Sequence, residues 1–102
     1  MKANKLLKRI ESRTAPVIID VRTGIEFKRG HVPGAIHAPP RKILLKAAKL
    51  PRAKDTEIVV YCEHGQRAWL ANTLLTARGY THTALLEGHL LDWKKAGLPL
   101  EK

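Results

Sequence analysis

Short apolar runs alternate with segments of helical spacing along the chain, and this alternation constrains the fold more than any other feature. The runs PVIIDV and EIVVYC have the length and the β-branched content of strands that are buried on both faces. Residues 3–12 and 66–78 carry apolar residues at helical spacing instead. Strands that alternate with helices form βαβ units, whose right-handed crossovers place helices on both faces of a mainly parallel sheet. The sequence therefore predicts an α/β fold.

Capping and turn signals predict the remaining elements. Thr23 and Glu26 have the spacing of a capping box, which predicts a short helix that ends at Gly30. The other expected elements are a brief strand at 35–37, a helix at 41–50, a last strand within THTALLEG and a last helix at about 89–96. The helix over 66–78 is expected to bury one face, formed by Trp69, Leu70, Leu74 and Ala77.

Length and hydropathy bound the chain further. The 102 residues suffice for one modest core, so we expect a single domain over residues 1–102. No apolar run approaches the roughly 20 residues of a transmembrane helix. The basic start of the chain lacks the apolar centre of a secretory signal. We therefore expect a cytoplasmic protein that does not enter the membrane and that works as a monomer.

The chain is strongly basic, with 19 Lys and Arg against 9 Asp and Glu and a net charge of +10. Such a field attracts anions, which include small inorganic anions and acidic protein partners. The basic residues gather in residues 2–13 and 41–54, where no aromatic side chains interleave with them. Single-strand binders stack bases on such aromatics, so nucleic acid is not an expected partner.

The only cysteine of the chain, Cys62, ends the strand EIVVYC and directly precedes a helix. Parallel sheets bind ligands outside the carboxyl ends of their strands, which is where this thiol is expected. The unused N–H groups and the dipole of the next helix favour negative charge there, and hence the thiolate. Gly65 lets the loop close tightly, and Arg67 carries forked donors that hold an anion. A lone cysteine usually packs as a small core residue, but this combination predicts a nucleophile in an anion cradle.

The two residues after Cys62 act on it in opposite senses. The carboxylate of Glu63 opposes ionisation of the thiol, whereas a protonated His64 supports it. We favour the interpretation that the side chains of Glu63 and His64 point outward and influence which molecules dock. One cysteine excludes an internal disulfide and a cysteine-rich zinc site, and we expect neither a metal nor a cofactor. The other four histidines also lack metal-ligand spacing: His31, His37, His82 and His89.

Three segments resemble signatures of the rhodanese-like sulfurtransferase family. VIIDVRTGIEFKRGHVPGAIHAP is similar to the first signature, IVVYCEHGQRAWLANTLL to the active-site segment, and ALLEGHLLDWKKAGLPL to the C-terminal signature. They stand in the family's order and extend over about residues 15–100. The resemblance implies a three-layer α/β fold with a five-stranded, mostly parallel sheet and helices on both faces.

The resemblance also implies an activity. In the family, the cysteine of a CxxGxR loop takes the outer sulfur of a donor such as thiosulfate as a persulfide. It then passes this sulfur to cyanide or another thiophilic acceptor such as a thiol. Matched onto this chain, Cys62 is the nucleophile, and the substrate-binding cradle consists of Glu63, His64, Gly65, Gln66 and Arg67. Asp20 and Arg22 match the family's Asp-Val-Arg segment and are expected to support the sheet edge near the loop.

The resemblance assigns structural roles to His31, in a turn of the first signature, and to Trp93, which is expected to anchor the last helix in the core. The chain also departs from the family at one point. The C-terminal signature usually carries two adjacent glycines, whereas this sequence has Gly88 and His89. The backbone at this point, and with it the rim of the site, is therefore not fixed by the resemblance.

Other functions stay open at this stage. Cysteine phosphatases and arsenate reductases also surround an anion with a cysteine and an arginine, but five residues separate the two, whereas four (63–66) do so here. A docking or regulatory module is disfavoured because Cys62 and its loop are complete. A sulfur-relay protein that hands persulfide to a protein partner would share the chemistry at Cys62, so the sequence does not separate it from a thiosulfate:cyanide transferase.

Overall fold

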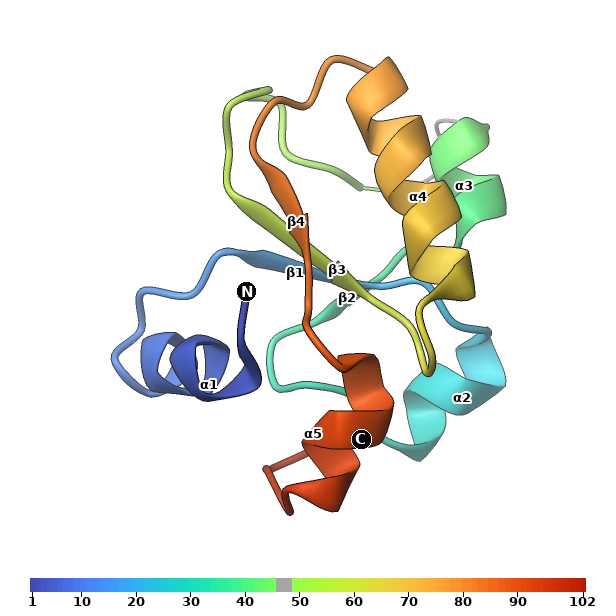
Figure 1. Ribbon diagram of the computed structural model, residues 1–102. Coiled ribbons are helices and arrows are strands. Elements are labelled where there is room, and N and C mark those ends of the chain that lie inside the picture. Colours follow the sequence, from blue (N-terminus) through green and yellow to red (C-terminus); the bar gives the residue numbers. More distant parts are fainter. Residues whose placement is uncertain (46–48) are drawn as a thin grey trace.

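The computed structural model describes residues 1–45 and 49–102, which form three layers, a sheet with helices on both faces (Figure 1). The predicted α/β class is confirmed. In chain order the elements are α1 (Ala3–Glu11), β1 (Val17–Asp20), α2 (Gly24–Arg29), β2 (Ile36–His37), α3 (Pro40–Leu44), β3 (Ile58–Tyr61), α4 (Gln66–Ala77), β4 (Thr83–Leu85) and α5 (His89–Lys95).

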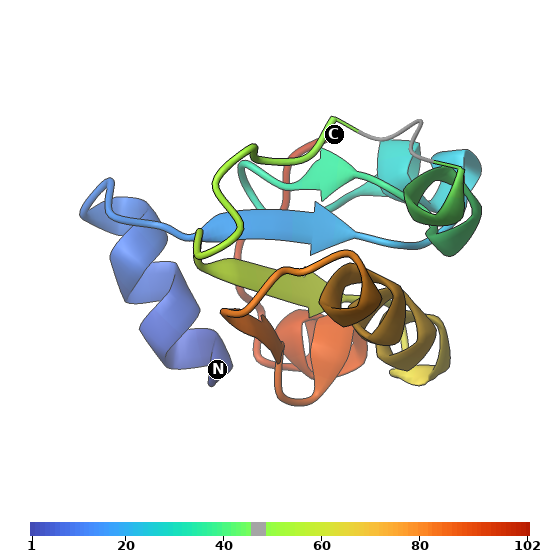
Figure 2. The same ribbon diagram turned by 90° about the horizontal axis from the view of Figure 1, so that it is seen from above.

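The sheet has the strand order β2-β1-β3-β4, and all its pairs are parallel (Figure 2). Ile36, Ile19, Val60 and Leu85 lie side by side in one row across the four strands. The chain runs from β1 outward to β2 and then crosses back over β1 to β3. The switch in direction therefore falls between β1 and β3, at whose carboxyl ends such sheets bind ligands.

The prediction of five strands is wrong, because the sheet has four strands among the residues that the structure describes. In place of a fifth strand, His31 and Glu101 form an isolated antiparallel bridge, in which each N–H donates to the other's carbonyl at 2.9 Å. The next bonded pair of such a ladder would be Pro33 and Pro99. Because proline has no N–H to donate, the pairing stops after a single bridge.

The alternation of β3 divides the core between the two faces of the sheet. Ile58, Val60 and Cys62 belong to the cluster that α3 and α4 cover, whereas Val59 and Tyr61 belong to the cluster that α1 and α5 cover. Figure 1 shows these helix pairs on opposite sides of the strands. The register of one strand thus sends the thiol toward α4 and the phenol of Tyr61 toward α5.

The buried face of α4 differs from the predicted one. Ala68, Ala71 and Leu75 are fully buried, whereas Trp69 is 66% exposed and Leu70 is 45% exposed. Both sets of residues have helical spacing, so periodicity alone did not separate them. Alanines allow the helix to approach the sheet closely, and the large apolar residues on the neighbouring face are left toward solvent.

Most other element predictions are confirmed within one or two residues. The capping box is present: the N–H of Glu26 donates to Thr23 Oγ1, and the N–H of Thr23 donates to the Glu26 carboxylate. Trp93 is fully buried and donates from Nε1 to the carbonyl of Pro99 at 2.8 Å. The helix expected over 41–50 is shorter, because α3 ends at Leu44; residues 46–48 lie outside the described part of the chain.

His31 is held in the core by its ring, and the described helices of the chain are short. His31 is buried, its ring stacks on Phe27 at a centroid distance of 3.8 Å, and its Nδ1 lies 2.9 Å from the carbonyl oxygen of Phe27. Its structural role is thereby confirmed. Over residues 1–45 and 49–102, every helix is too short or too polar to cross a bilayer.

Candidate active site

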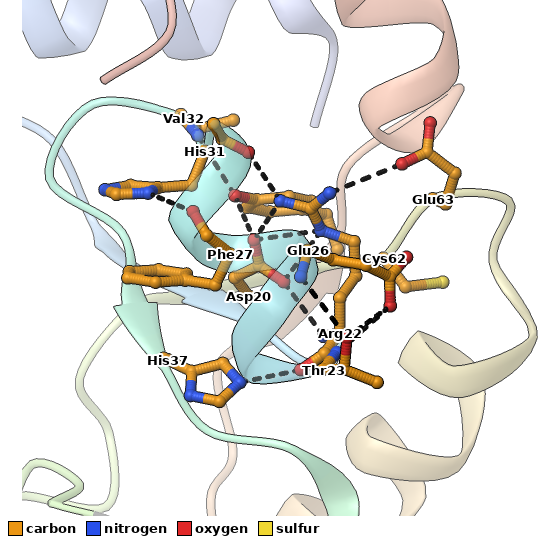
Figure 3. A network of polar contacts seen from close by, with 12 residues as sticks. Asp20, Arg22, Thr23, Glu26, Phe27, His31, Val32, His37, Cys62 and Glu63 are labelled. Carbon is orange, nitrogen blue, oxygen red and sulfur yellow. Dashed lines mark hydrogen bonds and ion pairs between the residues drawn. The ribbon is translucent and has the colours of Figure 1, made fainter. Parts of the chain in front are cut away.

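Cys62 directly follows β3, and its backbone continues into the loop that opens α4. The residue is only 1% exposed, and its sulfur accepts a hydrogen bond from the N–H of Gly65 at 2.8 Å. Figure 3 shows the sulfur directed toward this loop. Within the described residues, several other N–H groups of the loop have no hydrogen-bond acceptor, namely those of Glu63, His64, Gln66 and Arg67. The loop thus keeps donors available for an anion or a thiolate.

Gly65 makes the tight closure of this loop possible. Its φ angle is +118°, in the region that favours glycine, and it precedes the first residue of α4. The space beside its Cα is filled by another residue, because a Cβ placed there would lie 2.9 Å from Nε2 of His89. Both the backbone angle and this contact require glycine at position 65.

The N-terminus of α5 holds the loop from the other side. The N–H groups of Leu90 and Leu91 donate to the carbonyls of Cys62 and Glu63 at 3.0 and 3.2 Å. The N–H of Cys62 in turn donates to Nδ1 of His89 at 3.4 Å. Burial lowers the pKa of His89, although the nearby carboxylate of Asp92 opposes this, so the neutral ring that can accept a hydrogen bond is favoured.

His89 therefore replaces the family's second glycine with a ring that packs on the loop. Its φ angle is +51°, a conformation that glycine adopts without strain and other residues adopt rarely. The sequence showed the departure at this position but assigned it no role. The structure supplies one, since a side chain at 89 contacts both Cys62 and Gly65.

Arg67 is partnered by Glu26, whose spacing in the sequence predicted only a role in the helix cap. Its guanidinium donates to both carboxylate oxygens of Glu26, at 2.6 and 3.2 Å. The hydrogen bonds from Arg67, assisted by those from Thr23, hold the pKa of Glu26 at about 2. The same bonds, together with the charges of Glu26 and Cys62, raise the pKa of Arg67. Arg67 thus stays charged beside the thiol, in a fixed position.

Asp20 and Arg22 form a buried ion pair at the carboxyl end of β1, beside the loop (Figure 3). The guanidinium of Arg22 donates to both oxygens of Asp20 and, at 2.7 Å, to the carbonyl of Gly30. Tyr61 adds a third bond, because its hydroxyl donates to Asp20 at 2.7 Å. Although burial opposes the charge, the bonds to Asp20 keep the pKa of Arg22 above its ordinary value. The charges are thereby satisfied in the core.

Glu63 does not point outward as expected. Its side chain is 19% exposed and accepts from Arg22 at 3.4 Å (Figure 3). It also accepts from Lys94 of α5 at 3.3 Å. This carboxylate therefore joins the buried ion pair to α5 rather than standing free beside the sulfur. The side chains of His64 and Gln66 are exposed at the mouth of the loop, which agrees with the expectation for His64.

The structure thus gathers the loop residues 62–67 with the pair Asp20 and Arg22 at one edge of the sheet. Three residues that the sequence did not predict at the site also lie there: Glu26, His89 and Lys94. The spacing of a capping box located Glu26 in its helix, but its side chain meets Arg67, which is 41 positions away. No local pattern carries such information.

Fold and site together define an α/β domain with a cysteine–arginine loop at the switch point of a parallel sheet. Residues 2–96 match the family described as Rhodanese-like domain. The chain therefore belongs to the rhodanese-like domain family, as its sequence signatures indicated.

Three relatives illustrate this membership. A protein of Allochromatium vinosum named sulfurtransferase is 30% identical over 98 residues, which cover 96% of this chain and 90% of that protein. Thiosulfate:glutathione sulfurtransferase of Saccharomyces cerevisiae is 30% identical over 104 residues, which cover 89% and 75%. The crystal structure of the Alr3790 protein from Anabaena sp. matches with a TM-score of 0.86 and 32% identity over 99% of this chain and 80% of that chain. Of two longer relatives the chain spans only 55% and 42%.

Proposed function

We propose that this protein transfers a sulfane sulfur through a persulfide on Cys62. The thiolate attacks the outer sulfur of thiosulfate or a similar anionic donor, the bond between the two donor sulfurs breaks, and sulfite leaves with the electron pair. Cyanide or an acceptor thiolate then attacks the outer sulfur of the persulfide. Cys62 leaves as a thiolate, and thiocyanate or a new persulfide is released. Neither step consumes an external oxidant or reductant.

One observation carries the proposal: the sulfur of Cys62 accepts the N–H of Gly65 inside a loop in which, among the described residues, the N–H groups of residues 63, 64, 66 and 67 have no acceptor. A ring of donors around a sulfur stabilises both the attacking thiolate and the persulfide anion that follows it. The ring contains four residues between Cys62 and Arg67, which suits a sulfur atom better than a tetrahedral phosphate. This size argues against a cysteine phosphatase.

The residues around the loop have distinct roles in this proposal. Arg67 attracts the anionic end of the donor, and Glu26 holds the guanidinium in position. The backbone of Glu63, His64, Gly65 and Gln66 forms the cradle, and Asp20 with Arg22 supports it from β1. Two relatives are named sulfurtransferases, and the name of one of them, thiosulfate:glutathione sulfurtransferase, includes thiosulfate. These names support the proposed transfer.

Intact mass measurement tests the proposal directly, because Cys62 is the only cysteine of the chain. The purified protein is weighed before treatment, after thiosulfate and after subsequent cyanide. We expect a gain of one sulfur atom that cyanide reverses, and no gain in the variant Cys62→Ser. If neither thiosulfate nor another sulfane donor adds sulfur to the wild type, the proposed transfer is refuted, and a docking function becomes the better explanation.

A further inference from the structure

A cavity lies beside the loop and is larger than a thiosulfate ion requires. It has a volume of about 500 Å³, within the range of roughly 300–1,000 Å³ that is usual for pockets that bind small organic ligands. The start of α2, at Thr23 and Gly24, lines one part of it, and residues 39–42 line another. Arg67 of the loop completes the wall, so the cavity adjoins the proposed site at this residue.

The charge of this cavity has one sign. Its lining includes Arg22, Arg41, Lys42 and Arg67, and none of the described residues that line it is Asp or Glu. Arg22 and Arg67 already have carboxylate partners, but in the described part of the chain no carboxylate forms an ion pair with Arg41 or Lys42. Their side chains are exposed and contribute an uncompensated charge to the rim.

A smaller cavity on the opposite side of the loop has a mixed charge. It has a volume of about 200 Å³, and its lining includes Glu26 and Glu63 together with three basic residues, Arg22, Arg29 and Lys94. Arg67 lines the larger cavity and its partner Glu26 lines the smaller one, so this ion pair lies between the two cavities, and Arg22 lines both. An organic anion is favoured in the larger cavity, whose charged side chains are all cationic, over the smaller one, where two carboxylates offset most of the positive charge.

The larger cavity is also on the side of the sheet to which Cys62 points. Cys62 packs in the same cluster as Val21, which lines the cavity, and as Ile43 of α3. The cavity and the thiol therefore lie on the same face of the sheet, and Arg67 of the lining belongs to the loop of Cys62. Arg67 serves the sulfur donor, but that small ion needs neither the full volume of the cavity nor the charges of Arg41 and Lys42. The second substrate is the molecule that would use them.

We propose that this cavity binds the acceptor of the transfer, that the acceptor is a small organic thiol bearing carboxylate groups, and that Arg41 and Lys42 select it over neutral thiols. This inference rests on the proposed function of Cys62. In the step concerned, the acceptor thiolate attacks the outer sulfur of the Cys62 persulfide, the bond between the two sulfurs breaks, and the acceptor leaves as its own persulfide while Cys62 returns to the thiolate.

Single-turnover discharge of the loaded protein tests this inference. The wild type and the double variant Arg41→Gln/Lys42→Gln are loaded with thiosulfate, freed of excess donor and mixed with mercaptosuccinate or with 2-mercaptoethanol. Loss of the extra sulfur is followed by quenched intact mass. The variant/wild-type ratio of rates for each thiol removes the difference in intrinsic reactivity between the two thiols. A control, Lys2→Gln/Lys5→Gln, removes the same charge from exposed positions at the start of the chain.

We expect the cavity variant to discharge mercaptosuccinate about fivefold more slowly than the wild type, as two partly exposed charge pairs imply. Its loading by thiosulfate and its reaction with 2-mercaptoethanol should change by less than about twofold, since neither uses these two charges. Succinate, which has no thiol, should slow the reaction of mercaptosuccinate with the wild type and have a weaker effect on the cavity variant.

Each contrary result has a distinct meaning. Equal slowing of both thiols in the cavity variant, or equal slowing of mercaptosuccinate by the control variant, overturns the proposed selection. A wild type that discharges normally but ignores succinate also overturns it. A wild type that takes up no sulfur refutes the function proposed for Cys62 instead; binding of succinate, measured by calorimetry with both proteins, then decides whether the cavity is an anion site at all.

Discussion

Gly65 and His89 are in direct contact, because the imidazole of His89 occupies the space in which a side chain at position 65 would begin. A Cβ on Gly65 would lie 2.9 Å from Nε2 of His89, closer than real Cβ contacts occur. The loop that follows Cys62 therefore packs against the start of α5 with no space for a side chain at position 65. The first prediction concerns this contact.

We expect Gly65→Ala to destabilise the protein by about 2 kcal/mol or more, because it adds a steric clash to an unfavourable φ angle. Gly79 provides a matched control, since its φ is +96° but nothing lies within 4 Å of a Cβ placed there. Gly79→Ala thus measures the backbone penalty alone. Urea unfolding of both variants, and of Gly65→Ala/His89→Gly, separates the two effects. If Gly65→Ala is no worse than Gly79→Ala, the contact with His89 does not matter.

Stability should depend on pH through the carboxylate of Glu26. Its pKa of about 2 in the folded protein lies below the ordinary value of 4.5. The stabilisation is therefore fully present above pH 4.5 and is lost as the pH falls toward 2. Glu26→Gln should lower the free energy of unfolding by about 1 kcal/mol at pH 7, since the pair is partly exposed. The difference from the wild type should vanish in acid; a constant difference across the pH range contradicts this.

Arg67 should matter for donor use and little for folding. Arg67→Ala is expected to lower kcat/KM for thiosulfate at least about tenfold, the effect of losing a charge-assisted hydrogen bond. The side chain of Arg67 is 40% exposed, so the free energy of unfolding should fall by only about 1 kcal/mol. The control is Arg52→Ala, which removes an arginine from an exposed position outside the loop 62–67. Kinetics that match those of this control would remove Arg67 from the site.

The hydroxyl of Tyr61 should contribute strongly to stability. It donates to Asp20 at 2.7 Å and accepts from the N–H of Val32 at 3.0 Å, and both partners are buried. Burial, and then the charge of Asp20, raise the pKa of Tyr61, so the hydroxyl keeps its proton for the bond. Tyr61→Phe leaves two buried groups short of a partner and should cost about 2–3 kcal/mol in thermal or urea unfolding. Tyr80→Phe loses one bond, to the carbonyl of Pro51, and should cost less.

The exposed face of α4 should tolerate substitution. Trp69 is 66% exposed, so Trp69→Ser should change the free energy of unfolding by no more than about 0.5 kcal/mol. Leu75, on the buried face of the same helix, is fully covered, and Leu75→Ala should cost about 2–5 kcal/mol. Denaturant unfolding compares the two. The opposite ranking would restore the face that the sequence pattern predicted.

Much of this protein followed from local sequence alone. The α/β class, the helix cap at Thr23 and the strand that ends at Cys62 each depend on residues within one short segment. The loop from Cys62 to Arg67 is likewise contiguous, so its cradle of N–H groups was predictable from Gly65 and the helix that follows. Local propensity and turn chemistry act over a few residues, so the elements that depend on them can be predicted from a short segment of sequence.

The tertiary structure decided which residues meet across the sequence. Arg67 pairs with Glu26, which is 41 positions away in the sequence, and Glu63 pairs with Lys94, which is 31 positions away. It also decided which face of α4 is buried, since Ala71 and Trp69 fit helical spacing equally well and only close approach to the sheet selects the small residue. These contacts depend on how separate elements pack in space, and that packing is set by the whole core rather than by any one segment.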